Sequence, residues 1–118
     1  MPSRYAFPRY ERLIRRNEFE RVFQEGLRKQ SRGFVWYGLR REGQGRKFGC
    51  TVSRKIGNAV ERNRIKRYLR EIYRTHRPFL REDIHMVVVA RSEASHMSFH
   101  ECRSAVLELF RAGDALNG

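Results

Sequence analysis

Apolar and polar residues recur along this chain with periods that predict three helices and three strands. The first helix is expected over residues 17–25. Phe19, Val22 and Phe23 follow helical spacing there and should share one face. Asn17 stands where a side chain can cap the first turn of this helix.

Three shorter segments carry the β-branched and aromatic residues that are typical of strands. Residues 33–40 and 47–53 flank a turn that contains two glycines, which predicts an antiparallel pair joined by a hairpin. Residues 84–90 are almost entirely apolar and β-branched. We therefore expect this third strand in the centre of the sheet, where both of its faces are buried.

Two further helices begin at residues that suit a helix cap. Asn58 precedes a long helix that should continue to about His76, and Pro78 then stops it. Ser98 precedes the last helix, with Glu101 in the supporting position. The core face of that helix should consist of Phe99, Cys102, Val106, Leu109 and Phe110, with Leu107 beside them. The order helix, strand, strand, helix, strand, helix predicts an α+β fold with helices on a small mixed sheet.

The length of 118 residues suits a single domain, and residues 1–11 are expected to form an irregular lead-in to it. Cys50 and Cys102 show no metal-binding or pairing spacing, so we expect both to be reduced. No stretch resembles a signal peptide or is long and apolar enough to cross a membrane. These features together predict a cytoplasmic protein.

Charge changes this picture most. The chain has 26 Lys and Arg against 13 Asp and Glu, a formal net charge of +13. Such a surface repels itself unless anions bind to it, which makes nucleic acid or an anionic membrane the natural partner. Most of the cations are arginine, which makes bidentate contacts to phosphate and stacks on bases. The balance therefore favours nucleic acid, and we expect residues 1–118 to form one RNA-binding domain.

The charge is most ordered on the helix that Asn58 begins. Its apolar side is expected to consist of Ile65, Tyr68, Leu69 and Ile72. A basic stripe climbs the helix four residues at a time through Arg62, Lys66, Arg70 and Arg74, with Arg67 at its edge and Arg64 on the other flank. An ordinary solvated helix surface is the plain alternative. Arginines near the positive end of the helix dipole are locally unfavourable, however, and become favourable if a phosphate docks there.

The run from Lys55 to Arg67, Lys-Ile-Gly-Asn-Ala-Val-Glu-Arg-Asn-Arg-Ile-Lys-Arg, resembles the Arg-Asn-Arg signature of the bacterial ribonuclease P protein family. The resemblance extends to residues 17–23, 34–37, 49–53 and 90–91. It implies a ribosomal-protein-like topology with a left-handed strand–helix–strand crossover. General rules would predict a right-handed one.

The resemblance also implies a function. Members of the family pair with a large catalytic RNA, and the complex removes the 5′ leader from precursor tRNA. It implies an endoribonuclease whose catalytic centre and Mg²⁺ ions lie in the RNA, with no catalytic residue, metal or cofactor held by the protein. The expected partners are the catalytic RNA and precursor tRNA, with no membrane and no further protein. The residues implied to face the RNA subunit are Arg62, Asn63, Arg64, Lys66, Arg67 and Arg70.

A second site is implied for the single-stranded leader, in a cleft between the first helix and the sheet. The matching positions are Phe19, Phe23, Tyr37, Arg54, Lys55 and Arg91. Aromatic platforms flanked by cations suit single strands, because bases stack on the rings while phosphates meet the charges. Aromatic pairs at helical spacing more often lie in a core, and without the resemblance we would place Phe19 and Phe23 there.

Two other functional classes are compatible with a basic α+β chain. A general RNA-binding module, such as a ribosomal protein, would share the charge but needs no leader cleft. A self-sufficient metal-dependent nuclease would need clustered carboxylates, which the sequence does not show. His96, His100 and Glu101 are a weak metal candidate, because a cap at Ser98 would leave His96 outside the helix.

Overall fold

The computed structural model describes residues 6–117, which form three α-helices and one four-stranded sheet. The elements in chain order are α1 (Arg16–Glu25), β1 (Leu27–Ser31), β2 (Phe34–Arg40), β3 (Lys47–Val52), α2 (Ala59–His76), β4 (Ile84–Ala90) and α3 (Phe99–Ala112). Short 3₁₀ turns lie at η1 (Arg9–Glu11), η2 (Arg54–Ile56), η3 (Arg77–Phe79) and η4 (Ser92–His96). The predicted α+β class is confirmed, with one strand more than expected.

The sheet has the strand order β1-β2-β4-β3, so the predicted hairpin between residues 33–40 and 47–53 is wrong. β4 lies between those two strands, antiparallel to β2 and parallel to β3. The physical reason is burial: β4 is apolar on both faces, so it gains most from a central position, and the short β2–β3 connection does not compel its strands to pair. The central placement predicted for residues 84–90 is confirmed.

The strand missing from the prediction is β1, at the edge of the sheet. It pairs antiparallel with β2 from Leu27 opposite Gly38 to Ser31 opposite Phe34. Its sequence, Leu-Arg-Lys-Gln-Ser, has no apolar alternation, and most of it is exposed. β1 is held by backbone pairing with β2 and by a 3.1 Å hydrogen bond from Ser31 Oγ to the Ala105 carbonyl. A hydrophobicity pattern records neither interaction.

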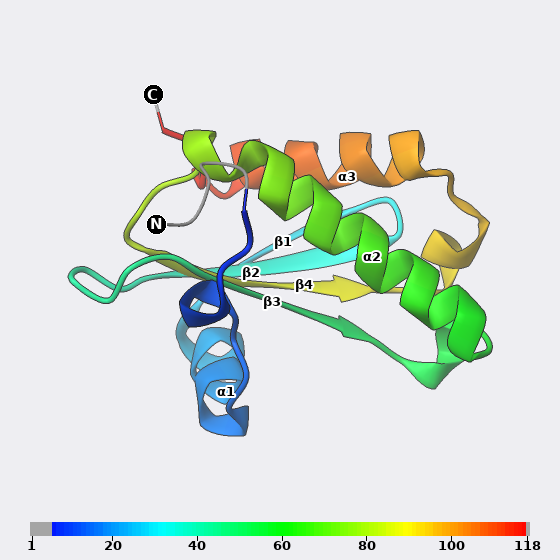
Figure 1. The fold of residues 1–118 in the computed structure, drawn as a ribbon, viewed down its shortest axis with the longest axis horizontal. Helices are drawn as coiled ribbons and strands as arrows, with labels where there is room; N and C mark the ends of the chain where they lie inside the picture. The colour runs from blue at the N-terminus through cyan, green and yellow to red at the C-terminus, as the bar shows by residue number, and fades with distance from the viewer. Residues whose placement is uncertain (1–5, 118) are drawn as a thin grey trace.

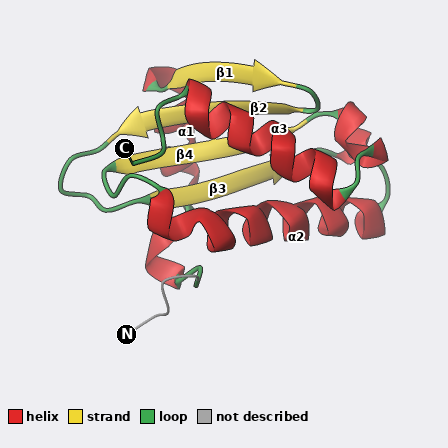
Figure 2. Cartoon of the chain, turned by 90° about the horizontal axis from the view of Figure 1, so that it is seen from above, coloured by secondary structure: helices red, strands yellow, loops and turns green. Residues whose placement is uncertain are grey.

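The helices cover the two faces of the sheet unequally. α2 and α3 lie side by side over one face, and α1 projects from the other (Figure 1). Seen from the side of α2 and α3, the chain runs along β3, returns through α2 and enters β4 on the left of the β3 direction (Figure 2). This β3–α2–β4 crossover is therefore left-handed, as the family resemblance implied.

Most apolar burial lies between the sheet and the α2–α3 layer. Its largest fully buried side chains include Phe34, Trp36, Phe48, Ile65, Leu69, Ile72, Tyr73, Met86 and Phe110. A much smaller cluster of Leu13, Val22 and Val87 lies under α1 on the opposite face. α1 covers only part of that face (Figure 1).

Helix capping follows the prediction for two helices and departs from it in the third. The Asn58 side chain accepts a 3.0 Å hydrogen bond from the Glu61 backbone N–H, and Ser98 caps α3 with Glu101 in a capping box. The cap of α1 is Arg15 rather than Asn17, and its N–H donates to the Glu18 carboxylate at 3.3 Å. The first helical residue is therefore Arg16, one residue ahead of the predicted start at Asn17.

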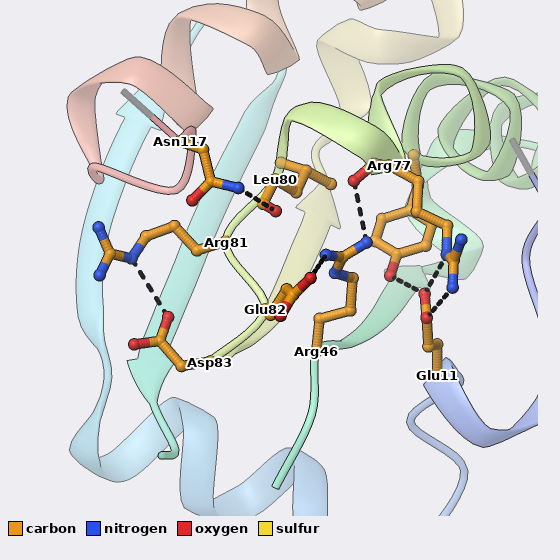
Figure 3. Close-up of polar contacts among 9 residues, drawn as sticks. Glu11, Arg46, Arg77, Leu80, Arg81, Glu82, Asp83 and Asn117 are labelled. Carbon is orange, nitrogen blue, oxygen red and sulfur yellow. Dashed lines mark hydrogen bonds and ion pairs between the residues drawn. The ribbon is translucent and has the colours of Figure 1, made fainter. Parts of the chain in front are cut away.

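The irregular lead-in expected over residues 1–11 ends instead in a 3₁₀ turn, η1, whose last residue, Glu11, is buried. Residues 1–5 of it lie outside the described residues. The Glu11 carboxylate accepts a hydrogen bond from the Tyr73 hydroxyl at 2.5 Å. It also accepts two from the Arg77 guanidinium, at 2.8 and 2.5 Å (Figure 3). Burial and the neighbouring carboxylate raise the pKa of the Tyr73 phenol above its usual range. Arg46 adds a 3.0 Å hydrogen bond to the Arg77 carbonyl, so this cluster ties η1 to the end of α2.

Candidate nucleic-acid interface

The outer side of α2 presents four of the residues expected to face an RNA subunit. Asn63, Arg67 and Arg70 are exposed, and Lys66 is half-buried, while Ile65 on the inner side is fully buried. Within residues 6–117 these four polar side chains make no hydrogen bond or ion pair. Their charges and donors are therefore available to phosphate groups.

The two arginines at the start of α2 are arranged differently, because both donate to the protein backbone. Arg62 Nη1 donates to the Gly57 carbonyl at 2.9 Å. Arg64 Nη2 donates to the Ser95 carbonyl at 2.7 Å, and its Nη1 donates to the Met97 carbonyl at 3.3 Å. The structure thus divides the six predicted residues into four with free polar groups and two that brace neighbouring turns.

The basic stripe is neutralised at the far end of the helix. Arg74 donates two hydrogen bonds to the Glu71 carboxylate, at 3.0 and 2.5 Å. These bonds lower the pKa of Glu71 below its usual value. The free positive charge of the stripe therefore lies on Lys66, Arg67 and Arg70, ahead of Glu71.

Three aromatic residues gather on the opposite face of the sheet, as the leader-cleft prediction requires. The rings of Phe23 and Tyr37 meet edge-to-face with centroids 4.9 Å apart, and Phe19 lies 6.5 Å from Phe23. Phe23 is 37% exposed, so it does not belong to the core. Phe19 is half-buried against the backbone of Gly49, where an added Cβ would lie 2.7 Å from its ring.

The three cations of the predicted cleft lie at one end of the sheet. β3 and β4 run parallel, with Val52 opposite Ala90 at their carboxyl ends. Arg54 and Lys55 follow β3, Arg91 follows β4, and the turns η2 and η4 lie against each other. All three side chains are exposed, and none has a polar partner among the described residues.

The aromatic groups lie on the face from which α1 projects (Figure 1), and the cations follow the carboxyl ends of β3 and β4 at one end of the sheet. Val89 and Thr51, both half-buried, lie between them on neighbouring strands. We call this arrangement the leader surface: Phe19, Phe23, Tyr37, Arg54, Lys55 and Arg91. It combines rings on which bases can stack with separate charges that can meet phosphates.

The described residues show neither a metal-binding cluster nor a membrane-spanning helix. Residues 6–117 contain no group of three or more His, Cys, Asp or Glu placed to hold a metal ion, and His96 and His100 are exposed. No helix in the described part of the chain is long and apolar enough to cross a membrane. Cys50 and Cys102 are both free thiols, and Cys102 is buried in the core as expected.

Known proteins resemble this chain over nearly its whole length. The family model Ribonuclease P matches residues 7–113. The chain is 38% identical over 115 residues to the ribonuclease P protein component of Dictyoglomus thermophilum, covering 95% of each chain. It is 40% identical over 101 residues to that of Bacillus pumilus, covering 85% of each.

Solved structures agree with the fold as well. The RNase P protein of Staphylococcus aureus has a TM-score of 0.85 at 28% identity, covering 91% of this chain and 98% of the other. That of Thermotoga maritima has a TM-score of 0.78 at 31% identity, covering 86% and 96%.

Proposed function

The chain belongs to the ribonuclease P protein family, and from that premise we propose that it grips two RNAs, the catalytic RNA subunit and the 5′ leader of precursor tRNA. Its membership makes it the protein component of a ribonuclease complex that acts in tRNA processing. The proposal assigns each RNA to one of the two surfaces described above.

The observation that carries this proposal is the presence of two chemically different RNA-compatible surfaces side by side on one small domain. Asn63, Lys66 and Arg67 present polar groups on the outer side of α2, which suits a phosphate-lined groove of a folded RNA. Arg70 borders a cavity that also reaches Phe19. The leader surface adds Phe23 and Tyr37, which suit unpaired bases. A general RNA-binding module would need only the first.

We place the catalytic centre and its Mg²⁺ ions in the RNA subunit. The chain itself supplies charge and stacking platforms. Cations that neutralise phosphates lower the repulsion between the RNA subunit and its substrate, which reduces the Mg²⁺ concentration needed for efficient cleavage. With both cysteines free, we assign the complex to the cytoplasm.

Binding to the leader is tested by comparing precursor and mature tRNA. We expect the protein to raise the affinity of the RNA subunit more for precursor than for mature tRNA. An equal gain for both would leave the leader surface without a role and favour a general RNA-binding module. Stem-loop RNA of unrelated sequence serves as the control for nonspecific binding.

A further inference from the structure

The surface around the start of α1 belongs to neither of the two sites above. Tyr10 is 63% exposed and Ile14 is 60% exposed, which is unusual for two large apolar side chains so close in the chain. They border an open cavity of about 780 Å³. Its lining residues are Arg9, Tyr10, Arg12, Ile14, Arg15, Asn17, Glu18 and Lys47.

This segment is held firmly even though its outer side chains are exposed. Glu11 is anchored by Arg77 and Tyr73, and the Leu13 N–H donates to the Phe48 carbonyl of β3 at 3.0 Å. Glu11 and Leu13 are buried, so the residues that alternate with them face outward. Tyr10 and Ile14 are therefore presented on a fixed backbone, and binding would cost little ordering entropy.

The segment is continuous with the leader surface. A second cavity, of about 280 Å³, is also lined by Arg12 and Ile14 and extends to Phe19 on one side and to Arg70 of α2 on the other. Phe19 in turn neighbours Phe23, which meets Tyr37. Apolar and aromatic groups thus follow one another from Tyr37 through the start of α1 to Tyr10.

The charge of the segment identifies the chemistry of its occupant. Four cations line the larger cavity, and its single carboxylate, Glu18, is paired with Lys47 at 2.7 Å. Arg9 and Arg15 are exposed and make no side-chain polar contact with the described residues. Cations beside the flat ring of Tyr10 and the apolar side chain of Ile14 match single-stranded RNA, which offers a phosphate and a base at each nucleotide.

We propose that the leader surface continues past Phe19, and that nucleotides of the 5′ leader far from the cleavage site pass over Ile14 and Tyr10. The inference rests on the proposed function. Arg54, Lys55 and Arg91 lie at the end of the sheet where α2 begins, beside the surface assigned to the RNA subunit. The leader therefore enters at that end and leaves past α1.

Leader length provides the test. The reconstituted complex is assayed for binding of one precursor tRNA that carries either a short leader, reaching only Phe23, or a long one. We expect the long leader to bind more tightly. The double variant Tyr10→Ala, Ile14→Ala should lose about fivefold or more in affinity for the long form while binding the short form normally. Phe79→Ala is the matched control, because Phe79 is 53% exposed and borders a different cavity, together with Phe99 and Arg103 of α3.

Each other outcome has a definite meaning. Equal losses for short and long leaders would place Tyr10 and Ile14 against the RNA subunit and overturn the inference. It is also overturned if the long leader binds no more tightly than the short one to the unaltered complex. Phe23→Ala serves as the separate check: if it leaves the preference for precursor over mature tRNA intact, the proposed leader surface itself fails.

Discussion

The guanidinium of Arg64 on α2 donates a 2.7 Å hydrogen bond to the carbonyl oxygen of Ser95 in η4. Arg62 makes the equivalent contact with Gly57, at the end of η2. η2 carries Arg54 and Lys55, and η4 directly follows Arg91. Hydrogen bonds from the first turns of α2 thus hold both η2 and η4, the turns next to the leader-surface cations. They connect the two proposed RNA surfaces.

This bracing predicts that Arg64→Lys destabilises the protein although its charge is kept. Lysine cannot reproduce the planar fork that reaches the Ser95 and Met97 carbonyls. We expect a loss of about 1–3 kcal/mol in the free energy of unfolding, measured by urea denaturation. The salt dependence of binding to the RNA subunit should keep its slope. Unchanged stability of Arg64→Lys would contradict this bracing role.

Arg70→Ala should have the opposite effect. Arg70 is exposed and has no polar partner among the described residues, so its removal should leave stability nearly unchanged. If it meets one phosphate of a duplex region, the slope of log affinity against log salt should become shallower by about 0.9. Arg103→Ala, which removes an exposed arginine from α3, is the control for net charge. Identical slopes for the two variants would contradict a specific contact at Arg70.

Phe23→Ala should weaken binding of precursor tRNA and leave binding of mature tRNA unchanged. One lost stacking contact corresponds to about 1–3 kcal/mol in binding free energy. Since Phe23 is 37% exposed, we expect only a small change in stability. The measurement is the ratio of the two affinities, with Phe79→Ala as the control variant. A loss of stability with no change in that ratio would assign Phe23 to packing.

Glu11→Gln should be strongly destabilising. It removes the charge that neutralises Arg77, whose side chain is largely buried, and it weakens the contact with Tyr73. Removing one partner of a buried ion pair typically costs about 3–5 kcal/mol. Urea denaturation of this variant, beside Glu108→Gln at an exposed position, gives the comparison. Equal unfolding free energies for the two variants would contradict a structural role for the cluster.

The buried imidazole of His85 should make the folded protein less stable in acid. Burial lowers the pKa of this imidazole, and the charges of Lys47 and Arg41 lower it further, against smaller opposing effects of Glu18 and the Gly45 backbone. In the unfolded chain, His85 takes up a proton as the pH falls through about 6.5, whereas in the folded chain it does so only at a lower pH. The contribution of His85 to the free energy of unfolding is therefore fully present above about pH 6.5 and decreases as the pH falls towards the folded-state pKa.

The check on His85 is urea denaturation at a series of pH values between about 7 and 5. His85→Gln should flatten the decline in unfolding free energy, whereas His100→Gln, at an exposed position, should retain it. If both variants decline as the unaltered protein does, another group causes the acid sensitivity.

Local signals in the sequence predicted most of the helices and one strand well. Asn58 and Ser98 cap the helices they were expected to cap, and residues 84–90 form β4 with the predicted bounds. These features depend on neighbouring residues, which a hydrophobicity pattern records. β1 and the strand order depend on pairing between distant segments, so the pattern predicted a hairpin that does not exist.

The candidate site shows the same division. Helical spacing placed Phe19 and Phe23 together, and the structure adds Tyr37 from β2 as predicted by resemblance. The backbone contacts of Arg64 could not be predicted, because η4 lies some thirty residues away along the chain. Glu11 gave no signal either, since a carboxylate in a basic segment is ordinarily solvated.

We expect the protein to act only together with a catalytic RNA. The most direct test is cleavage of a 5′-extended precursor tRNA at low Mg²⁺ by protein alone, by a bacterial ribonuclease P RNA alone, and by the two mixed. We expect efficient removal of the leader only by the mixture. Cleavage by the protein alone, or a mixture no more active than the RNA, would contradict it.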